Sequence, residues 1–120
     1  MANTRILIVD DSDDFLQSAT LLLSATPGVT VVGRAHSGEE AVSETERLLP
    51  DLVLMDVQMP GMGGLAATRV IKARARAPRV IVLTMHDSAE YREAADAAGA
   101  NGFLSKLAFT TAISAMLPPA

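Results

Sequence analysis

Apolar residues gather in five short runs along the chain, and segments with helical spacing separate these runs. The first, third and fourth runs are continuously apolar, which is typical of strands buried on both faces of a parallel sheet. The second run also contains Thr30, Gly33 and Arg34, a mixture that suits an edge strand. The pattern predicts strands at residues 5–10, 29–35, 52–56, 79–84 and 102–105.

The segments after these runs repeat their apolar residues at the 3.6-residue period of an amphipathic helix. Helices are expected at residues 13–25, 38–49, 64–75, 88–98 and 109–117, the last of them ending at Pro118 and Pro119. The apolar face of the fourth helix is almost entirely alanine, so this helix buries little area per turn. We expect it to be the least firmly packed of the five.

Strand and helix alternate five times, which is typical of a parallel sheet covered by helices on both faces. We predict a doubly wound α/β fold in which five parallel strands follow the order 2-1-3-4-5. Sheets of this kind bind ligands in the crevice at the carboxyl ends of the strands, here between the first and third strands. The 120 residues suffice for one domain with one core.

Composition excludes several classes of function. The formal net charge of −4 argues against nucleic-acid binding by this domain alone, because such binding needs a basic surface. The absence of cysteine excludes disulfides, zinc-thiolate sites and thiol catalysis. No segment has the length of a membrane span, and the start of the chain lacks an apolar signal region. We therefore expect a cytoplasmic protein without a membrane partner.

Reactive side chains stand where the predicted strands end. They are Asp10 and Asp11 after the first strand, Asp56 at the end of the third, Thr84 at the end of the fourth and Lys106 after the fifth. Because the carboxyl ends of parallel strands share one edge of the sheet, we expect these side chains to meet at the mouth of the crevice.

Three carboxylates at one mouth repel one another unless a hard cation joins them. Mg²⁺ is the natural candidate for Asp10, Asp11 and Asp56, because it prefers oxygen ligands and combines one or two carboxylates with water and phosphate. The alternative is that Asp10 and Asp11 only end the strand and cap the next helix, with Ser12 and Asp13 as rival caps. For this pair the sequence leaves both interpretations open.

A carboxylate at such a position can attack phosphorus and form an aspartyl phosphate. Asp56 would then need a metal, an ammonium group that neutralises the phosphoryl oxygens, and a hydrogen-bond donor that senses the new group. Lys106 and Thr84 supply the last two. A lysine or threonine at a strand end commonly has no such role, so the hypothesis depends on their joint placement.

The order and surroundings of these residues resemble the receiver domains of two-component response regulators, over essentially the whole chain. The resemblance rests on four segments: Asp10-Asp11, Asp56-Val57-Gln58-Met59-Pro60, Leu83-Thr84 and Gly102-Phe103-Leu104-Ser105-Lys106. Three more are similar to the NarL/FixJ branch: Val31-Val32-Gly33, Ser37-Gly38-Glu39-Glu40-Ala41 and Leu83-Thr84-Met85-His86-Asp87. The resemblance implies a flavodoxin-like (CheY-like) receiver domain over residues 1–120.

The same resemblance assigns roles to individual residues. It implies that Asp56 accepts a phosphoryl group and that Lys106 contacts that group. It implies that Mg²⁺ is held by Asp10, Asp11, Asp56 and the backbone carbonyl of Gln58. Thr84 and Phe103 would be the switch residues, and because Phe103 has no hydroxyl, its packing would report the state. Phe15 would lie on a kinase-docking surface, although its spacing also suits simple core packing.

Partners follow from the resemblance as well. The phosphoryl donor would be a sensor histidine kinase or a phosphotransfer protein, and the responding surface would be the fourth helix, fifth strand and fifth helix. Output would commonly pass through a helix-turn-helix DNA-binding domain. The resemblance also allows a phosphorylation-dependent homodimer of the receiver domain. Apart from its own phosphotransfer and dephosphorylation, the domain would not be an enzyme. The sequence names neither the kinase, the stimulus nor the output, and it leaves open whether the domain stands alone.

The chain departs from many receivers at two positions. Gly63 precedes Gly64 at the start of the third helix, where a side-chain cap is common, so the loop after Asp56 is expected to be looser. Leu107 follows Lys106 where many receivers have a cis proline. A cis bond before a non-proline residue costs about 2.5–4 kcal/mol, so we expect a trans bond here.

Two other classes of protein remain alternatives at this stage. A magnesium-dependent phosphatase of the haloacid dehalogenase type also uses an aspartyl nucleophile, but it usually carries a second acid where this chain has Gln58. A flavodoxin-like FMN domain would share the topology. It needs a loop that binds phosphate after the first strand, where this chain has four acids among residues 10–14.

Overall fold

The computed structural model describes residues 3–117, apart from the side chains of Ser114 and Met116. Within this range the strands are β1 (Thr4–Val9), β2 (Val29–Ala35), β3 (Leu52–Asp56), β4 (Arg79–Thr84) and β5 (Gly102–Ser105). They pair in parallel in the order β2-β1-β3-β4-β5, so the predicted topology is confirmed. β2 lies at an edge, as its mixed sequence predicts.

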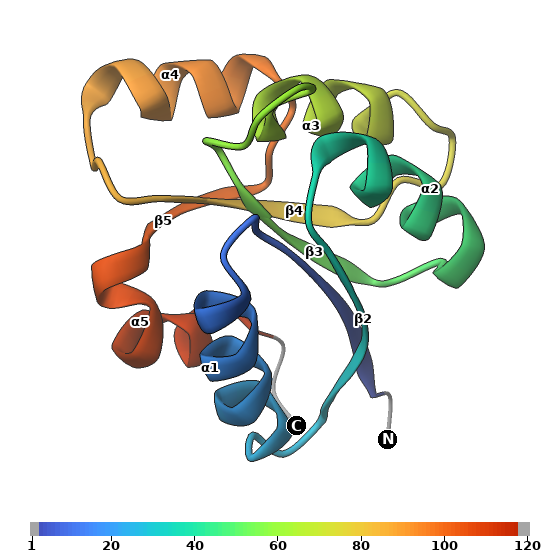
Figure 1. Cartoon of the computed structure of the whole chain (residues 1–120), viewed down its shortest axis with the longest axis vertical. Coiled ribbons are helices and arrows are strands. Elements are labelled where there is room, and N and C mark those ends of the chain that lie inside the picture. The colour runs from blue at the N-terminus through green and yellow to red at the C-terminus, as the bar shows by residue number, and fades with distance from the viewer. Residues whose placement is uncertain (1–2, 118–120) are drawn as a thin grey trace.

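Helices cover both faces of the sheet (Figure 1). The α-helices of the described range are α1 (Asp13–Ser24), α2 (Gly38–Leu48), α3 (Gly64–Lys72), α4 (Ala89–Ala97) and α5 (Phe109–Met116). α1 and α5 pack on one face, and α2, α3 and α4 pack on the other. Between residues 3 and 117, no helix has both the length and the apolar character needed to cross a membrane.

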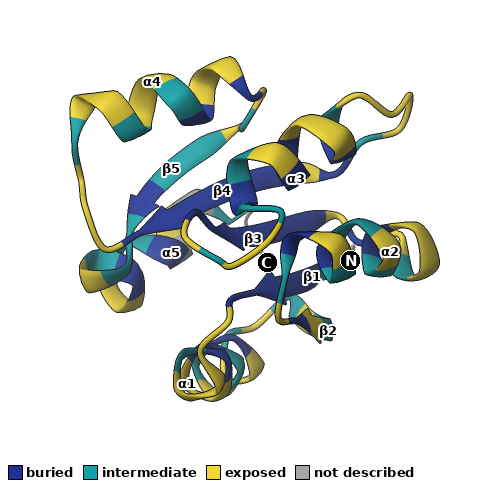
Figure 2. Cartoon of the chain, turned by 45° about the horizontal axis from the view of Figure 1, so that its top comes forward, coloured by how far each residue is buried: buried dark blue, intermediate teal, exposed yellow. Residues whose placement is uncertain are grey.

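Successive residues of a strand face opposite sides of the sheet, which divides the core into two layers. Leu52 and Leu54 of β3 belong to the layer under α1 and α5, whereas Val53 and Met55 belong to the layer under the other three helices. Figure 2 shows β1, β3 and β4 buried along most of their length. This is the burial that continuously apolar runs predict.

The elements start within one residue of the predicted positions, but several end earlier. The largest difference is at α3, which ends at Lys72 and not at residue 75. There the backbone N–H of Arg74 donates to the carbonyl of Ile71 at 3.3 Å, which closes a turn. The prediction of a longer helix was wrong because the chain must reverse here to enter β4, and Pro78 cannot continue a helix.

Two further ends differ from the prediction. Asp10 lies just outside β1, because its side chain accepts a hydrogen bond from the backbone N–H of Ser12 at 2.9 Å and turns the chain toward α1. A short 3₁₀-helix, η1 (Lys106–Ala108), precedes α5 and was not predicted. Pro118 and Pro119, the predicted end of the last helix, lie outside the described residues.

α4 buries little of its surface, as its alanine-rich face predicts. Ala95 is the one buried residue among its nine. Figure 2 shows most of the helix exposed or half-buried. Gly99 follows the helix with φ of +92°, a left-handed conformation that ends helices and favours glycine.

Candidate functional site

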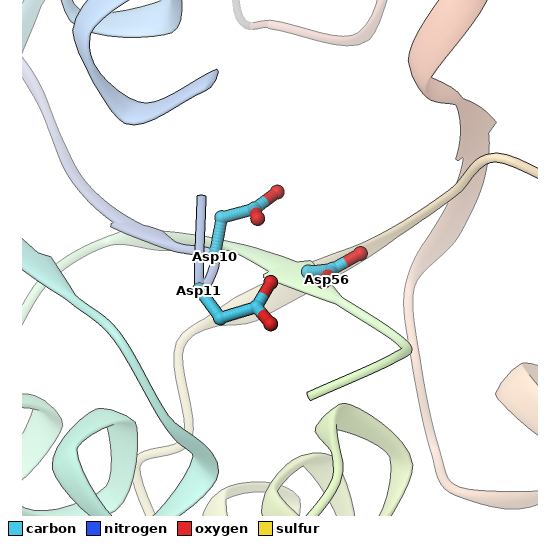
Figure 3. Close-up of side chains that lie close together, drawn as sticks. All are labelled: Asp10, Asp11 and Asp56. Carbon is cyan, nitrogen blue, oxygen red and sulfur yellow. The ribbon is translucent and has the colours of Figure 1, made fainter. Parts of the chain in front are cut away.

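Three carboxylates gather at the carboxyl ends of β1 and β3 (Figure 3). Asp10 follows β1 and Asp56 ends β3, and these strands are paired neighbours through Val9 and Met55. Oxygens of Asp10, Asp11 and Asp56 lie within 4.8 Å of one another. Asp10 and Asp56 are buried while Asp11 is exposed, so the cluster lies at the mouth of the crevice, as the sequence predicts.

Capping does not account for the whole acid cluster. Ser12 caps α1, since its hydroxyl accepts from the backbone N–H of Phe15 at 3.3 Å. Asp13, the rival cap, instead lies 2.9 Å from the His36 ring. One oxygen of Asp10 serves the turn into α1, but Asp11 takes no part in the cap.

Lys106 reaches the acid cluster from the end of β5. Its ammonium nitrogen lies 3.0 Å from Oδ1 of Asp56 and 2.5 Å from Oδ2 of Asp10. The bond to Leu107 is trans, as predicted, and the hydroxyl of Ser105 accepts from the N–H of Leu107 at 3.2 Å to start η1. A trans bond therefore still aims the ammonium group at Asp56.

Phe15 supports Lys106 from the α1 side. The ammonium nitrogen lies 4.8 Å from the centre of the Phe15 ring, close enough for a cation–π contact. The ring also packs edge-to-face on Phe109, with 5.5 Å between the ring centres. These contacts favour a packing role for Phe15, and its role in kinase docking stays a prediction.

The charges of the site oppose one another. Burial of Asp56 and the negative charge of Asp10 raise the pKa of Asp56, the hydrogen bond and charge of Lys106 lower it, and the net result is a pKa of about 6. Burial alone would lower the pKa of Lys106, but its contacts with Asp10 and Asp56 raise it above the ordinary value. Asp56 is thus held as a destabilised carboxylate beside a firmly charged ammonium group.

The residues present fit a magnesium ion. All three acids offer carboxylate oxygens, the ligand type that Mg²⁺ prefers. Oδ2 of Asp10 is fully buried, and although the Lys106 ammonium lies close, no donor in the described structure is aligned to hydrogen-bond it. A second cation would satisfy this oxygen and reduce the repulsion among the acids.

Thr84 and Phe103 lie on the neighbouring strands β4 and β5, and the side-chain partners described for them are in the segment that follows β4. The buried Thr84 hydroxyl accepts from the backbone N–H of His86 at 3.0 Å and donates to its carbonyl at 3.2 Å. The Phe103 ring is half-buried, with the Arg92 guanidinium 4.9 Å from its centre. Thr84 therefore contacts the loop that follows β4, and Phe103 contacts α4.

Tyr91 is a residue of the site that the sequence analysis missed. Its hydroxyl accepts a hydrogen bond from Nε2 of Gln58 at 2.7 Å. Its ring stacks on His86, with 6.4 Å between ring centres and 15° between the planes. Tyr91 falls within the helix expected at residues 88–98, but nothing in a periodic pattern links residues 33 positions apart.

The loop after Asp56 depends on Gly64. A Cβ atom there would lie 1.8 Å from the backbone oxygen of Asp56, so only glycine fits at this approach of α3 to β3. Gly63 caps α3 without a side-chain hydrogen bond, as expected. Its Cβ would meet only the Val57 oxygen at 3.5 Å, so this glycine is not required by space.

Comparison with known proteins decides the family. The model of the response regulator receiver domain matches residues 6–117. The chain belongs to this family. The predicted recognition and fold are thereby confirmed, and the phosphatase and flavin-binding interpretations lose their support.

Individual relatives of this receiver domain point the same way. It is 40% identical to the response regulator GacA of Pseudomonas viridiflava over 102 residues, which are 85% of the chain and 48% of that protein. It is also 40% identical over 104 residues to a protein-glutamate methylesterase/protein-glutamine glutaminase of Alkalilimnicola ehrlichii, covering 85% of the chain and 26% of that protein.

Among solved structures, the signal receiver domain of NarL from Mycobacterium tuberculosis superposes with a TM-score of 0.91 at 31% identity. The match covers 97% of this chain and 94% of that one. The chain spans about half the length of GacA and a quarter of the methylesterase. Receiver domains of this kind thus occur in proteins with different remaining parts.

Proposed function

We propose that this receiver domain accepts a phosphoryl group on Asp56 and thereby switches the surface that α4, β5 and α5 form. One observation carries the proposal. Asp56 is a buried carboxylate with an ammonium nitrogen 3.0 Å away and oxygens of two further acids within 4.8 Å. Such an arrangement suits an anionic nucleophile whose product carries still more negative charge.

The reaction is a transfer between two nucleophiles. An oxygen of Asp56 forms a bond to phosphorus, and the bond from phosphorus to the donor histidine nitrogen breaks, with its electron pair returning to the imidazole. The donor is a sensor histidine kinase or a phosphotransfer protein. Lys106 is already placed to hold one phosphoryl oxygen, and Mg²⁺ supplies positive charge for the others.

Asp10, Asp11, Asp56 and the backbone carbonyl of Gln58 are the proposed magnesium ligands. Affinity should be weak before phosphorylation, because a site with few protein ligands gains little until phosphate completes it. Asp11→Asn should weaken Mg²⁺ binding in a calorimetric titration, whereas Asp14→Asn, an exposed acid of the same segment, should not. Equal Mg²⁺ affinity in both variants would mean that Asp11 is a surface acid and not a ligand.

Thr84 and Phe103 are the proposed switch residues. Thr84 would exchange its bonds to the backbone of His86 for one to the phosphoryl group, which pulls on the loop before α4. Phe103, on β5, would repack beside Arg92 of α4. The switched surface is proposed to act on an output such as a DNA-binding domain, or on a second copy of this domain as a phosphorylation-dependent homodimer.

Phosphorylation is tested by incubation with acetyl phosphate and Mg²⁺ followed by intact mass measurement. The wild-type protein should gain one phosphoryl mass, Asp56→Asn should gain none, and Asp14→Asn should behave as wild type. Labelling of Asp56→Asn would contradict the assignment. Sustained turnover of a phosphate ester by the wild-type protein would indicate an enzyme instead, because a receiver consumes one donor per Asp56 and then waits for its own dephosphorylation.

A further inference from the structure

A side-chain bridge crosses the α4 side of the site. Gln58 stands two residues after Asp56, in the loop after β3, and its Nε2 donates to the hydroxyl of Tyr91 at 2.7 Å. His86 stands two residues after Thr84, in the loop after β4, and its ring stacks on the same tyrosine. Tyr91 therefore joins two loops that leave neighbouring strands at the carboxyl edge of the sheet.

The tyrosine is itself held in place by the start of α4. Ser88 caps this helix, and its hydroxyl accepts from the backbone N–H of Tyr91 at 3.2 Å. The Tyr91 ring is half-buried and packs against the core layer under α2, α3 and α4. Gln58 is exposed, so the hydrogen bond to Tyr91 restrains a side chain that packing leaves free.

We propose that Tyr91 is a positioning residue for dephosphorylation, which ties the lifetime of the phosphoryl group to the position of α4. This inference rests on the proposed phosphorylation of Asp56. In hydrolysis a water oxygen bonds to phosphorus, the bond from phosphorus to the Asp56 oxygen breaks, and its electron pair returns to the carboxylate. The water proton leaves to solvent or to the phosphate product.

The bridge slows this reaction by covering the α4 side of the crevice. Gln58 and His86 lie in the loops that follow the paired strands β3 and β4, and Asp56 ends β3, so both loops start beside the phosphorylated residue. Because Gln58 is hydrogen-bonded to Tyr91 and His86 stacks on the same ring, the two loops are held close to each other. This narrows the path by which water reaches the phosphorus atom. A displacement of α4 that separates Tyr91 from Gln58, beyond the change that phosphorylation itself causes, would release Gln58 and make hydrolysis faster.

Tyr91→Phe is the decisive substitution, because it removes the hydroxyl and keeps the ring that stacks on His86. After loading with acetyl phosphate and rapid removal of the donor, we expect the phosphorylated variant to decay about two- to tenfold faster than wild type. This range corresponds to the loss of one net hydrogen bond of about 0.5–1.5 kcal/mol. Glu90→Gln, at the exposed neighbour on α4, should decay at the wild-type rate.

A double-mutant cycle with Gln58→Ala separates positioning from general loosening of the fold. If Tyr91 acts through Gln58, Tyr91→Phe should not accelerate decay further in the Gln58→Ala background. An unchanged rate in Tyr91→Phe, or the same acceleration in both backgrounds, would overturn the inference.

Failure of the proposed phosphorylation would give a different result from failure of the inference about Tyr91. A wild-type protein that takes up no phosphoryl group at Asp56 would refute the phosphoacceptor role itself. The Gln58 side-chain amide can then be followed by nuclear magnetic resonance in the unmodified protein, with Tyr91→Phe as the comparison. Gln58 side-chain amide resonances that are identical in wild type and Tyr91→Phe would also overturn the hydrogen bond between Gln58 and Tyr91.

Discussion

α1 and α4 both begin at a serine cap shortly after a strand ends, but they bury very different side chains against the sheet. The Ser12 and Ser88 hydroxyls each accept from a backbone N–H three residues on, at 3.3 and 3.2 Å. Beyond the cap, α1 buries Leu16, Ala19 and Leu23, whereas α4 buries Ala95 alone. A buried leucine contributes roughly 1.5–3 kcal/mol and an alanine methyl group about 0.8 kcal/mol.

In the proposed function, this difference separates the region that carries the chemistry from the region that changes in response to it. Asp10, at the start of the segment that enters α1, contacts Lys106 and is a proposed magnesium ligand, so its position has to be firm. The proposed switch requires α4 to respond to a change of a few kcal/mol at Asp56, and an element with little buried area can do so. Its side-chain link to the site through Tyr91 has the strength of one hydrogen bond.

The largest effect is expected in α1. Leu23 is fully buried and Leu21 is 68% exposed on the same helix. Leu23→Ala should lower the free energy of unfolding by about 2–5 kcal/mol, because it leaves a cavity against the sheet. Leu21→Ala should change it by no more than about 0.5 kcal/mol in the same urea titration. Equal losses in the two variants would mean that α1 is not packed as described.

The next largest effect on the free energy of unfolding is expected from Asp56, and it depends on pH. The folded-state pKa of about 6 exceeds the ordinary value of 3.8, so the folded protein binds more protons than the unfolded chain between these values. Stability therefore falls as the pH rises through this window, by about 2–3 kcal/mol in total. With a chelator present, Asp56→Asn should gain that much over wild type between pH 4 and 7.

Added Mg²⁺ provides the control for this prediction. The ion should stabilise the wild-type protein at pH 8 and have much less effect on Asp56→Asn, because it compensates the charge of the buried carboxylate. A difference between the two proteins that stays constant over the whole pH range would show that burial does not strain Asp56.

A smaller effect is expected in α4. Ala95→Gly should cost about 1–2 kcal/mol, the sum of a lower helix propensity and one buried methyl group. Ala97→Gly, on the exposed side near the end of the helix, should cost less than about 1 kcal/mol. The two variants, compared by urea denaturation, isolate how much burial holds α4. A loss at Ala95 as large as that at Leu23 would remove the contrast between the helices.

Topology and the main site residues could be predicted because they depend on local patterns. Continuous apolar runs mark inner strands, and a parallel sheet brings their carboxyl ends to one edge. Asp10, Asp56 and Lys106 therefore meet as expected, with the ammonium nitrogen within 3.0 Å of both acids. Even the trans bond before Leu107 follows from the cost of the cis form.

Other features depend on contacts that no local pattern encodes. The hydrogen bond from Gln58 to Tyr91 joins a loop and a helix from distant parts of the chain. The requirement for Gly64 comes from its distance to the Asp56 backbone, for which the sequence analysis had no signal. The early end of α3 follows from the path into β4.

Amide hydrogen exchange before and after phosphorylation of Asp56 tests the contrast between the two regions most directly. In the unmodified protein, residues 88–98 should exchange faster than residues 6–9, because α4 has one buried residue whereas β1 is buried there throughout. Phosphorylation, or a beryllofluoride mimic, should change the exchange of residues 88–98 in wild type but not in Asp56→Asn. An α4 that is protected as well as β1 and does not respond to phosphorylation would contradict the account.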